Sequence, residues 1–276
     1  MSKATSRKSI VPTAHFASLV YGPAGVPTGD PAEEYHEASR LYPHIAPPQL
    51  AMLLELEAGS GLVRTIARSS LTHAHRQGLE LPAALPLLDS LGAAIARRCS
   101  RRAGYLRAIR LAELATVLSV SYAATVRPDR VSRRPVPSAG ALYPLDLYAI
   151  VLAVDGVERG IYHYDPFRHR LEHLRPVDVA DVKRAFVDAA LPDTASAVLV
   201  VTSVFWRSRC KYGPRGYRFS LLEAGHLAQN AVLAASALDL SALPVGGFYD
   251  RRLDELVGAD GLDQASVYAL VLGAET

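Results

Sequence analysis

The sequence predicts a layered domain in which helices pack on a β-sheet, of the α+β or α/β class. In the first half of the chain, apolar residues recur with helical spacing. After Pro137 they form runs of strand length that are rich in β-branched and aromatic residues. The predicted order is helices, strand, hairpin, helix, strand, buried helix and strand, which favours a mixed central sheet flanked by helices.

An irregular N-terminal segment precedes the predicted helices. Residues 1–50 are rich in Pro, Gly and Ser and show little periodicity. Leu, Ile and Ala then follow helical spacing in three stretches: PQLAMLLELEA (48–58), ALPLLDSLGAAIARR (84–98) and LAELATVLSVSYAAT (111–125). The first half is therefore expected to be mainly helical.

The second half is expected to supply the sheet. Three runs are typical of central strands covered on both faces: LDLYAIVLAV (145–154), ASAVLVVTSVF (195–205) and ASVYALVLG (265–273). Between the first two, residues 160–175 predict a hairpin that turns at Asp165–Pro166, and residues 178–191 predict a surface helix. Residues 220–240 are small or apolar almost all round, which predicts a buried central helix.

Composition favours a soluble cytoplasmic protein. The 276 residues contain no apolar run of the ~18 to 20 residues that cross a bilayer, and the first residues lack the apolar core of a signal peptide. Cys99 and Cys210 are too few for a disulfide framework or a four-thiolate metal site. The formal net charge of +3 is weak for a polyanion, so we expect neither a nucleic acid nor a membrane as partner.

Two motifs could contact an anion or a planar ligand. Arg98, Ser100 and Arg102 could form a phosphate clamp, because guanidinium groups bind phosphate in a bidentate manner; the alternative is a solvated basic turn. PSAGALYP (137–144) places small residues before a strand, so it is either a tight turn or a loop whose backbone approaches a ligand. The adjacent Gly246 and Gly247 form a second loop of this kind.

Further polar residues lie near the predicted buried helix. Lys211 and Tyr212 could move a proton as a base and its assistant; alternatively, they belong to a basic surface loop. On the helix itself, one stripe carries Glu223, His226 and Asn230, which face either a ligand or a structural network. No metal is expected, since the spacing of the histidines in residues 163–173 matches no closed zinc pattern.

The order of these motifs resembles that of the nitroreductase-like flavoproteins, and within them the SagB/ThcOx-type dehydrogenases. The specific stretches are RxSxR (98–102), PSAGALYPLDLY (137–148), YRFSLLEAGHLAQN (217–230) and PVGGFYD (244–250). The resemblance covers about residues 96–276 and implies an α+β nitroreductase-like fold. It implies an FMN-binding domain over residues 91–276, preceded by an irregular and helical extension over residues 1–90.

The resemblance also implies roles for individual residues at a site shared by two subunits of a homodimer. Arg98, Ser100 and Arg102 match the motif that grips the phosphate and ribityl chain of FMN. Pro137, Ser138, Ala139, Gly140 and Ala141 match the loop that the partner subunit lays against the flavin ring. Gly246 and Gly247 match the loop near flavin N5, and Lys211 and Tyr212 match the pair that deprotonates the substrate.

Two positions depart from the family pattern. Ala141 stands where classical nitroreductases often have asparagine, which argues against a plain NAD(P)H-dependent nitro reductase. The tail VLGAET has no basic residue for the phosphate, so Arg207 or Arg209 is the candidate substitute.

The implied activity is oxidation of peptide thiazolines or oxazolines to thiazoles or oxazoles in natural-product biosynthesis. The implied partners are a heterocycle-containing precursor peptide and a cyclodehydratase complex. Three alternatives stay open at this level. They are an NAD(P)H-dependent reductase of dehydroamino acids, enones or nitro groups, an oxidase of carrier-bound thiazolines in nonribosomal synthesis, and a non-catalytic scaffold.

Overall fold

The computed structural model describes residues 29–41, 65–66, 69–73, 75–101, 107–126 and 132–274. The chain forms two compact units, Met1–Ile45 and Ala46–Thr276. In the first unit, helix α2 (Pro31–Ala38) begins after Asp30, whose carboxylate accepts backbone N–H groups of the first turn. All the candidate site residues singled out from the sequence belong to the second unit. One of them, Arg102, lies outside the described residues.

A seven-stranded sheet in the order β1-β6-β5-β4-β7-β9-β8 forms the centre of the second unit. Its strands are β1 (Gly78–Glu80), β4 (Leu145–Val151), β5 (Gly160–Asp165), β6 (Arg170–Arg175), β7 (Ala197–Val204), β8 (Leu240–Val245) and β9 (Gln264–Ala274). Every pairing between these strands is antiparallel. The parallel part of the expected mixed sheet is limited, in the described residues, to an isolated bridge between Ile109 and Val154. A small separate ladder pairs β2 (Thr125–Val126) with β3 (Ser132–Arg133).

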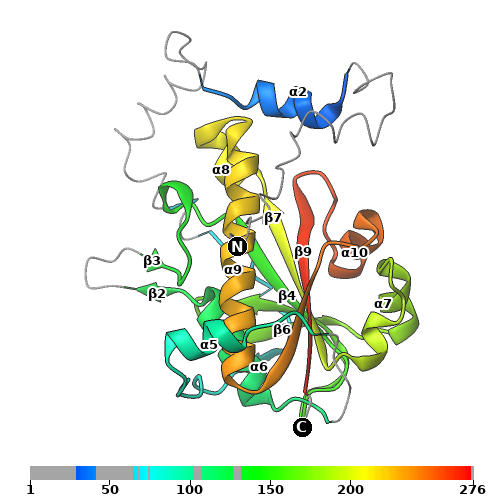
Figure 1. Ribbon diagram of the computed structural model, residues 1–276. Coiled ribbons are helices and arrows are strands. Elements are labelled where there is room, and N and C mark those ends of the chain that lie inside the picture. The colour runs from blue at the N-terminus through cyan, green and yellow to red at the C-terminus, as the bar shows by residue number, and fades with distance from the viewer. Residues whose placement is uncertain are drawn as a thin grey trace, which may run out of the picture. The chain divides into compact units, whose positions relative to one another are not determined.

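Helices cover both faces of the sheet (Figure 1). One face packs against α6 (Leu111–Tyr122) and α9 (Arg215–Ala237), with α5 (Leu91–Arg97) against α9. The other face packs against α7 (Val179–Ala185) and α10 (Asp250–Val257). Side chains of β4 alternate between the two cores, with Leu147 in the first and Tyr148 in the second. Coverage on both sides explains why the central strands are largely apolar, with Asp146 as a buried exception in β4.

The structure corrects several predicted element boundaries. The helix predicted from residue 84 begins only at Leu91, after the capping residue Ser90. Pro86 explains the difference, since proline has no N–H to donate and disfavours a helical residue before it. The segment before the central helix is itself helical, as α8 (Trp206–Tyr212), and the prediction missed strand β8. Because β8 is an edge strand, it tolerates Pro244. The helix predicted over residues 48–58 lies outside the described residues.

The central helix α9 has one buried and one exposed face in the single chain. Glu223, Leu227 and Ala231 lie on the buried face, and Leu222 and His226 lie on the exposed face. Leu222 is 60% exposed, which is unusual for leucine on a helix at the centre of a fold. None of the helices described here is long and apolar enough to cross a membrane.

Candidate functional site

Lys211 and Tyr212 lie against the loop of small residues that precedes β4. They form the last turn of α8, which ends at Tyr212 and is capped by Gly213. A Cβ atom added to Gly140 would lie 2.7 Å from Tyr212 Oη and 3.5 Å from Lys211 Nζ. The Tyr212 ring is held edge-on to Phe219, with 5.0 Å between the ring centroids. Two segments predicted from separate parts of the sequence therefore meet in one chain.

The loop itself has an unusual backbone. Ala139–Ala141 forms one turn of 3-10 helix, and φ is positive at Gly140 (61°), Ala141 (54°) and Tyr143 (46°). For an aromatic residue such as Tyr143 this conformation is strained. Ser138 Oγ accepts the backbone N–H of Tyr143 at 2.9 Å, which closes the turn. Pro137 and Gly140 are exposed, so the outer side of the loop is open to a ligand.

Glu223 lies behind this loop with almost no exposure to solvent. It is 2% exposed, and its Oε1 accepts the hydroxyl of Tyr122 at 2.8 Å. Burial raises the pKa of Glu223 to about 7, although hydrogen bonds from Ser138 and Tyr122 and the charge of Arg134 act in the opposite direction. The polar stripe predicted on α9 does not face one environment: Glu223 is buried, whereas His226 is exposed.

Arg134 is a buried cation next to the same loop. It is 7% exposed, and its guanidinium carbon lies 4.3 Å from the ring centroid of Tyr122 and 5.2 Å from that of Tyr143. Its Nε and Nη2 have no hydrogen-bond partner among the described residues. Sequence reasoning missed Arg134; the available signal was a basic residue close before the PSAGA stretch.

Arg207 anchors α8 to the sheet. Its Nη1 lies 2.8 Å from Asp146 Oδ2, and both side chains are buried. Burial would raise the pKa of Asp146, but Arg207 and His163 outweigh that effect and lower it to about 2. Arg209 lies over the Trp206 ring at 4.6 Å. Arg207, suggested by the sequence as a phosphate ligand, is thus engaged in an ion pair within its own chain.

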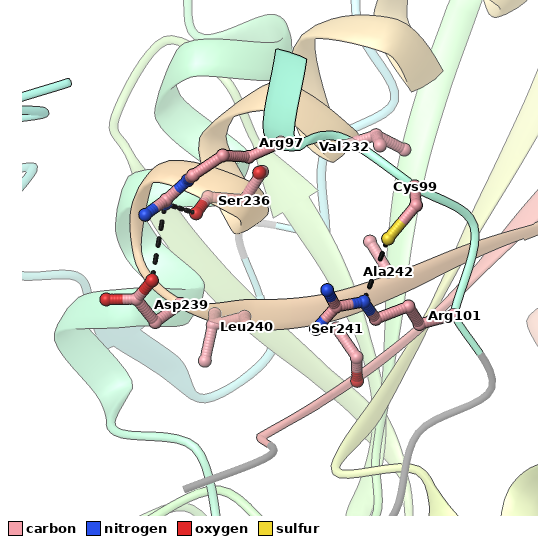
Figure 2. A pocket seen from close by; sticks show the side chains of 9 residues that line it. All are labelled: Arg97, Cys99, Arg101, Val232, Ser236, Asp239, Leu240, Ser241 and Ala242. Atoms are coloured by element: carbon pink, nitrogen blue, oxygen red, sulfur yellow. Dashed lines mark hydrogen bonds and ion pairs between the residues drawn. The ribbon is translucent and has the colours of Figure 1, made fainter. Parts of the chain in front are cut away.

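The RxSxR motif lies at the other end of α9. Arg98 caps the C-terminus of α5, Ser100 is exposed, and Arg102 lies outside the described residues. The adjacent pocket, of about 500 Å³, is shown in Figure 2. Its lining includes Arg97, Cys99 and Arg101, not Arg98 or Ser100. The remaining lining residues come from the end of α9 and from β8: Val232, Ser236, Asp239, Leu240, Ser241 and Ala242.

The pocket arginines are held by local contacts. Arg97 donates to the carbonyl of Ser236 and lies 3.2 Å from Asp239 Oδ1 (Figure 2). Arg101 Nε lies 2.8 Å from Cys99 Sγ. From Glu223 to Ser236 the helix rises about 20 Å at about 1.5 Å per residue. The RxSxR end and the loop end are therefore well separated within one chain.

Gly246 and Gly247 occupy a third place, directly after β8. Both are exposed, and the carbonyl of Gly247 accepts the N–H of Val187 at 3.0 Å. Phe248 then pairs with Phe186 in an isolated bridge at the end of α7. The described contacts do not join this loop to Lys211 and Tyr212 or to Arg98.

Curated proteins of similar sequence give independent information on the family. The sequence profile described as the nitroreductase family matches residues 95–274. MJ1384 of Methanocaldococcus jannaschii, whose name places it provisionally among the nitroreductases, is 37% identical over 53% of this chain and 73% of its own. The microcin B17-processing protein McbC of Escherichia coli is 32% identical over 52% of this chain. The chain spans 55% of the length of McbC.

Solved structures show the same fold. A protein of Anabaena variabilis, provisionally described as a nitroreductase, superimposes with a TM-score of 0.70 and 23% identity over 91% of this chain and 48% of that chain. A chain of the Escherichia coli microcin synthetase McbBCD complex with truncated pro-MccB17 bound superimposes with a TM-score of 0.57 and 21% identity. That match covers 88% of this chain and 97% of the other. The chain therefore belongs to the nitroreductase family of oxidoreductases, whose members typically bind FMN.

Proposed function

We propose that the chain is an FMN-dependent dehydrogenase that oxidises thiazoline or oxazoline rings of a peptide to thiazoles or oxazoles. The observation that carries this proposal is the approach of Lys211 and Tyr212 to Gly140. It joins a candidate base to the loop that is expected to face the flavin ring. The similarity to McbC, named as a microcin B17-processing protein, supports a peptide substrate.

The reaction removes two hydrogen atoms from the heterocycle. A proton leaves the α-carbon and a hydride leaves the β-carbon, and the aromatic ring that results provides the driving force. FMN, when bound, supplies the hydride acceptor. Lys211 or Tyr212 takes the proton, and their position beside Gly140 orients the substrate ring against the loop. Both side chains are half-buried, which limits the access of water.

The residues at the loop end fit a flavin. Side chains from Pro137 to Ala141 are small, and Gly140 is exposed with a positive φ, so a flat ring can approach the backbone. Arg134 places two unpartnered guanidinium nitrogens next to this loop. These nitrogens are themselves buried, so Arg134 would act on a flavin through its positive charge and not through a direct hydrogen bond.

At the other end, Arg98, Ser100 and Arg102 are our candidates for the phosphate and ribityl chain. The nearby pocket adds Arg97, which is paired with Asp239, and Arg101. We assign Gly246 and Gly247 to the vicinity of flavin N5. Their exposed backbone is compatible with close approach of a ring.

A homodimer would bring the RxSxR motif of one copy close to the PSAGA loop of the other. The RxSxR end and the loop end lie about 20 Å apart along α9, which favours a site built from one end of each of two copies. The exposed face of α9 supports this arrangement, since Leu221 and Leu222 are 41% and 60% exposed beside Gly225. Pairing of two such faces would bury both leucines.

The partners follow from the substrate. A cyclodehydratase must form the azoline before this chain can oxidise it, and the McbBCD complex provides a precedent for such an assembly in Escherichia coli. We propose that the precursor peptide and the cyclodehydratase are the partners and that the reaction takes place in the cytoplasm.

The test uses the purified chain with FMN and a synthetic peptide that contains one thiazoline. We expect a mass loss of about 2 Da, for two hydrogen atoms, and stoichiometric bleaching of the flavin in the absence of oxygen. Lys211→Ala should retain FMN and lose turnover, because the base is removed. Lys183→Ala is the matched control, since Lys183 lies on α7 and pairs there with the carboxylate of Asp193 from a later turn.

Other outcomes would reject the proposal. Full turnover by Lys211→Ala would remove Lys211 from the reaction. Rapid bleaching by NADPH together with no mass change in the peptide would indicate a reductase. A purified protein that binds no flavin at all would leave only a scaffold role.

A further inference from the structure

Two hydrogen-bond relays connect Glu223 to the backbone of the loop. In the first, Ser138 Oγ accepts the N–H of Tyr143, and the Ser138 side chain lowers the pKa of the Glu223 carboxyl. In the second, Tyr122 Oη accepts the N–H of Leu145 at 3.3 Å and donates to Glu223 Oε1 at 2.8 Å. The Tyr122 hydroxyl donates its hydrogen to Glu223, and Ser138 also favours the ionised carboxylate, so both relays meet at Glu223.

The segment held by these relays is strained. Gly140, Ala141 and Tyr143 all have positive φ, and two of them carry a Cβ that makes this conformation unfavourable. Strained backbone persists only where surrounding interactions hold it in place. Both relays end on backbone N–H groups of this segment, one of them on Tyr143 itself. The relays are therefore suited to maintain the loop shape.

We propose that Glu223, as the carboxylate acceptor of both relays, is a positioning residue that holds residues 138–145 in the shape that receives the flavin ring. It does not touch Gly140, but it fixes the turn that places Gly140 against Tyr212 and Lys211. This inference rests on the proposed function, because it takes the loop to face FMN.

Protonation of Glu223 should weaken the relays. The groups that face Glu223 or its partner are Ser138 from the loop, Tyr122 from α6, Arg134 after β3, Arg207 from α8 and Asp146 from β4. Burial nevertheless keeps the pKa of Glu223 at about 7. A protonated carboxyl must donate its own hydrogen, so one relay loses its acceptor. From pH 8 to pH 6 the ionised fraction falls from about nine tenths to about one tenth.

Global stability should respond in the opposite direction. The pKa of Glu223 in the folded chain lies above its ordinary value of 4.5, so the protonated form is favoured by folding. The stability that this group contributes is present below pH 4.5 and is lost as the pH rises through about 7. If Glu223 were purely structural, loop order and global stability would change in the same direction with pH. In the proposed role, loop order increases with pH while global stability decreases.

The first measurement is FMN affinity from pH 6 to pH 8, by quenching of flavin fluorescence. Relative to Glu223→Gln, the wild type should bind FMN about tenfold more weakly at pH 6 than at pH 8. The comparison cancels the titration of the FMN phosphate, which both proteins share. Tyr164→Phe is the control, since it removes a buried hydroxyl that bonds to His169, outside the relays; it should keep the wild-type pH profile.

The second measurement is hydrogen exchange at the amides of Tyr143 and Leu145 without FMN. Glu223→Gln keeps one acceptor oxygen instead of two. At pH 8, one of these two amides should therefore exchange faster in the variant than in the wild type. The thermal stability of the variant should be at least that of the wild type. If Glu223→Gln does not fold, Tyr122→Phe replaces it and should expose the Leu145 amide. Equal pH profiles and equal exchange in wild type and variant would overturn the inference. Absence of FMN binding in every protein would overturn the proposed function, and the exchange data would still decide the role of Glu223.

Discussion

Replacement of Gly140 by alanine tests the contact between the PSAGA loop and the end of α8. An added Cβ would lie 2.7 Å from Tyr212 Oη, below the 3.0 Å that real Cβ contacts respect. Phe219 packs against the Tyr212 ring, so the ring cannot move without disturbing its neighbour. We expect Gly140→Ala to displace either the loop or the candidate base.

The size of the effect can be divided into two parts. At a φ of 61°, alanine costs about 1 to 2 kcal/mol, of which about 0.4 to 1 kcal/mol is returned because the unfolded chain loses freedom. Overpacking adds about 1 kcal/mol or more. Gly156 has a φ of 73° and nothing within 4 Å of an added Cβ, so Gly156→Ala carries the backbone cost alone. The difference between the two variants isolates the contact.

Denaturant unfolding and turnover of a thiazoline peptide are the assays. We expect Gly140→Ala to unfold with about 1 kcal/mol or more less free energy than Gly156→Ala. Its kcat should fall about tenfold or more with FMN still bound, because a small misplacement of a reacting group is costly. Equal losses of stability in both variants, with normal turnover in Gly140→Ala, would refute the contact and its role.

Two further predictions concern charge and association. Glu113 is buried and bonded to Arg107 and Arg110; burial would raise its pKa, but these bonds lower it from 4.5 to about 2. Its ionised form therefore stabilises the fold above pH 4.5. As the pH falls towards 2, on the order of 1 to 2 kcal/mol of the free energy of unfolding should be lost. This is less than the full pKa shift implies, because Arg110 is exposed to solvent. Acid unfolding followed by circular dichroism should show this loss in the wild type but not in Glu113→Gln. Leu222→Glu places a charge on the exposed face of α9. We expect it to lower the dimer fraction measured by light scattering and the amount of bound FMN, with little change in helix content. An unchanged dimer fraction would exclude this face as the interface.

Local patterns in the sequence predicted much of the fold. Strands β4, β7 and β9 agree with the predicted strands to within three residues at each end, because a strand covered on both faces leaves a largely apolar signal. The hairpin turn at Asp165–Pro166 was also correct. The basic segment before α9 was not recognised as helix α8, since its charged residues obscure any periodicity. Strand β8 contains a proline and follows directly on a helix, so its strand character depends on pairing with β9.

The candidate site was predictable only in part. Small residues at Pro137–Ala141 and the pair Lys211–Tyr212 are visible as motifs, but their meeting at Gly140 depends on long-range packing. Glu223 was predicted to face a ligand or a structural network, but its partners could not be named, and Arg134 was missed because a buried charge looks like any other charged residue until its neighbours are known. The ion pair between Arg207 and Asp146 could not be predicted for the same reason.

The length of α9 imposes a constraint that acts apart from the identity of its residues. The helix carries Glu223 in its first half and contacts Arg97 through Ser236 at its C-terminal end. Inserting or deleting one residue between them would turn one end by about 100° relative to the other. The contacts of Glu223 and the contact between Ser236 and Arg97 could then not both be kept. A turn such as the one at Gly156, where nothing lies within 4 Å of an added Cβ, has room for change, whereas the length of α9 cannot change by a single residue without losing the register between its two contacts.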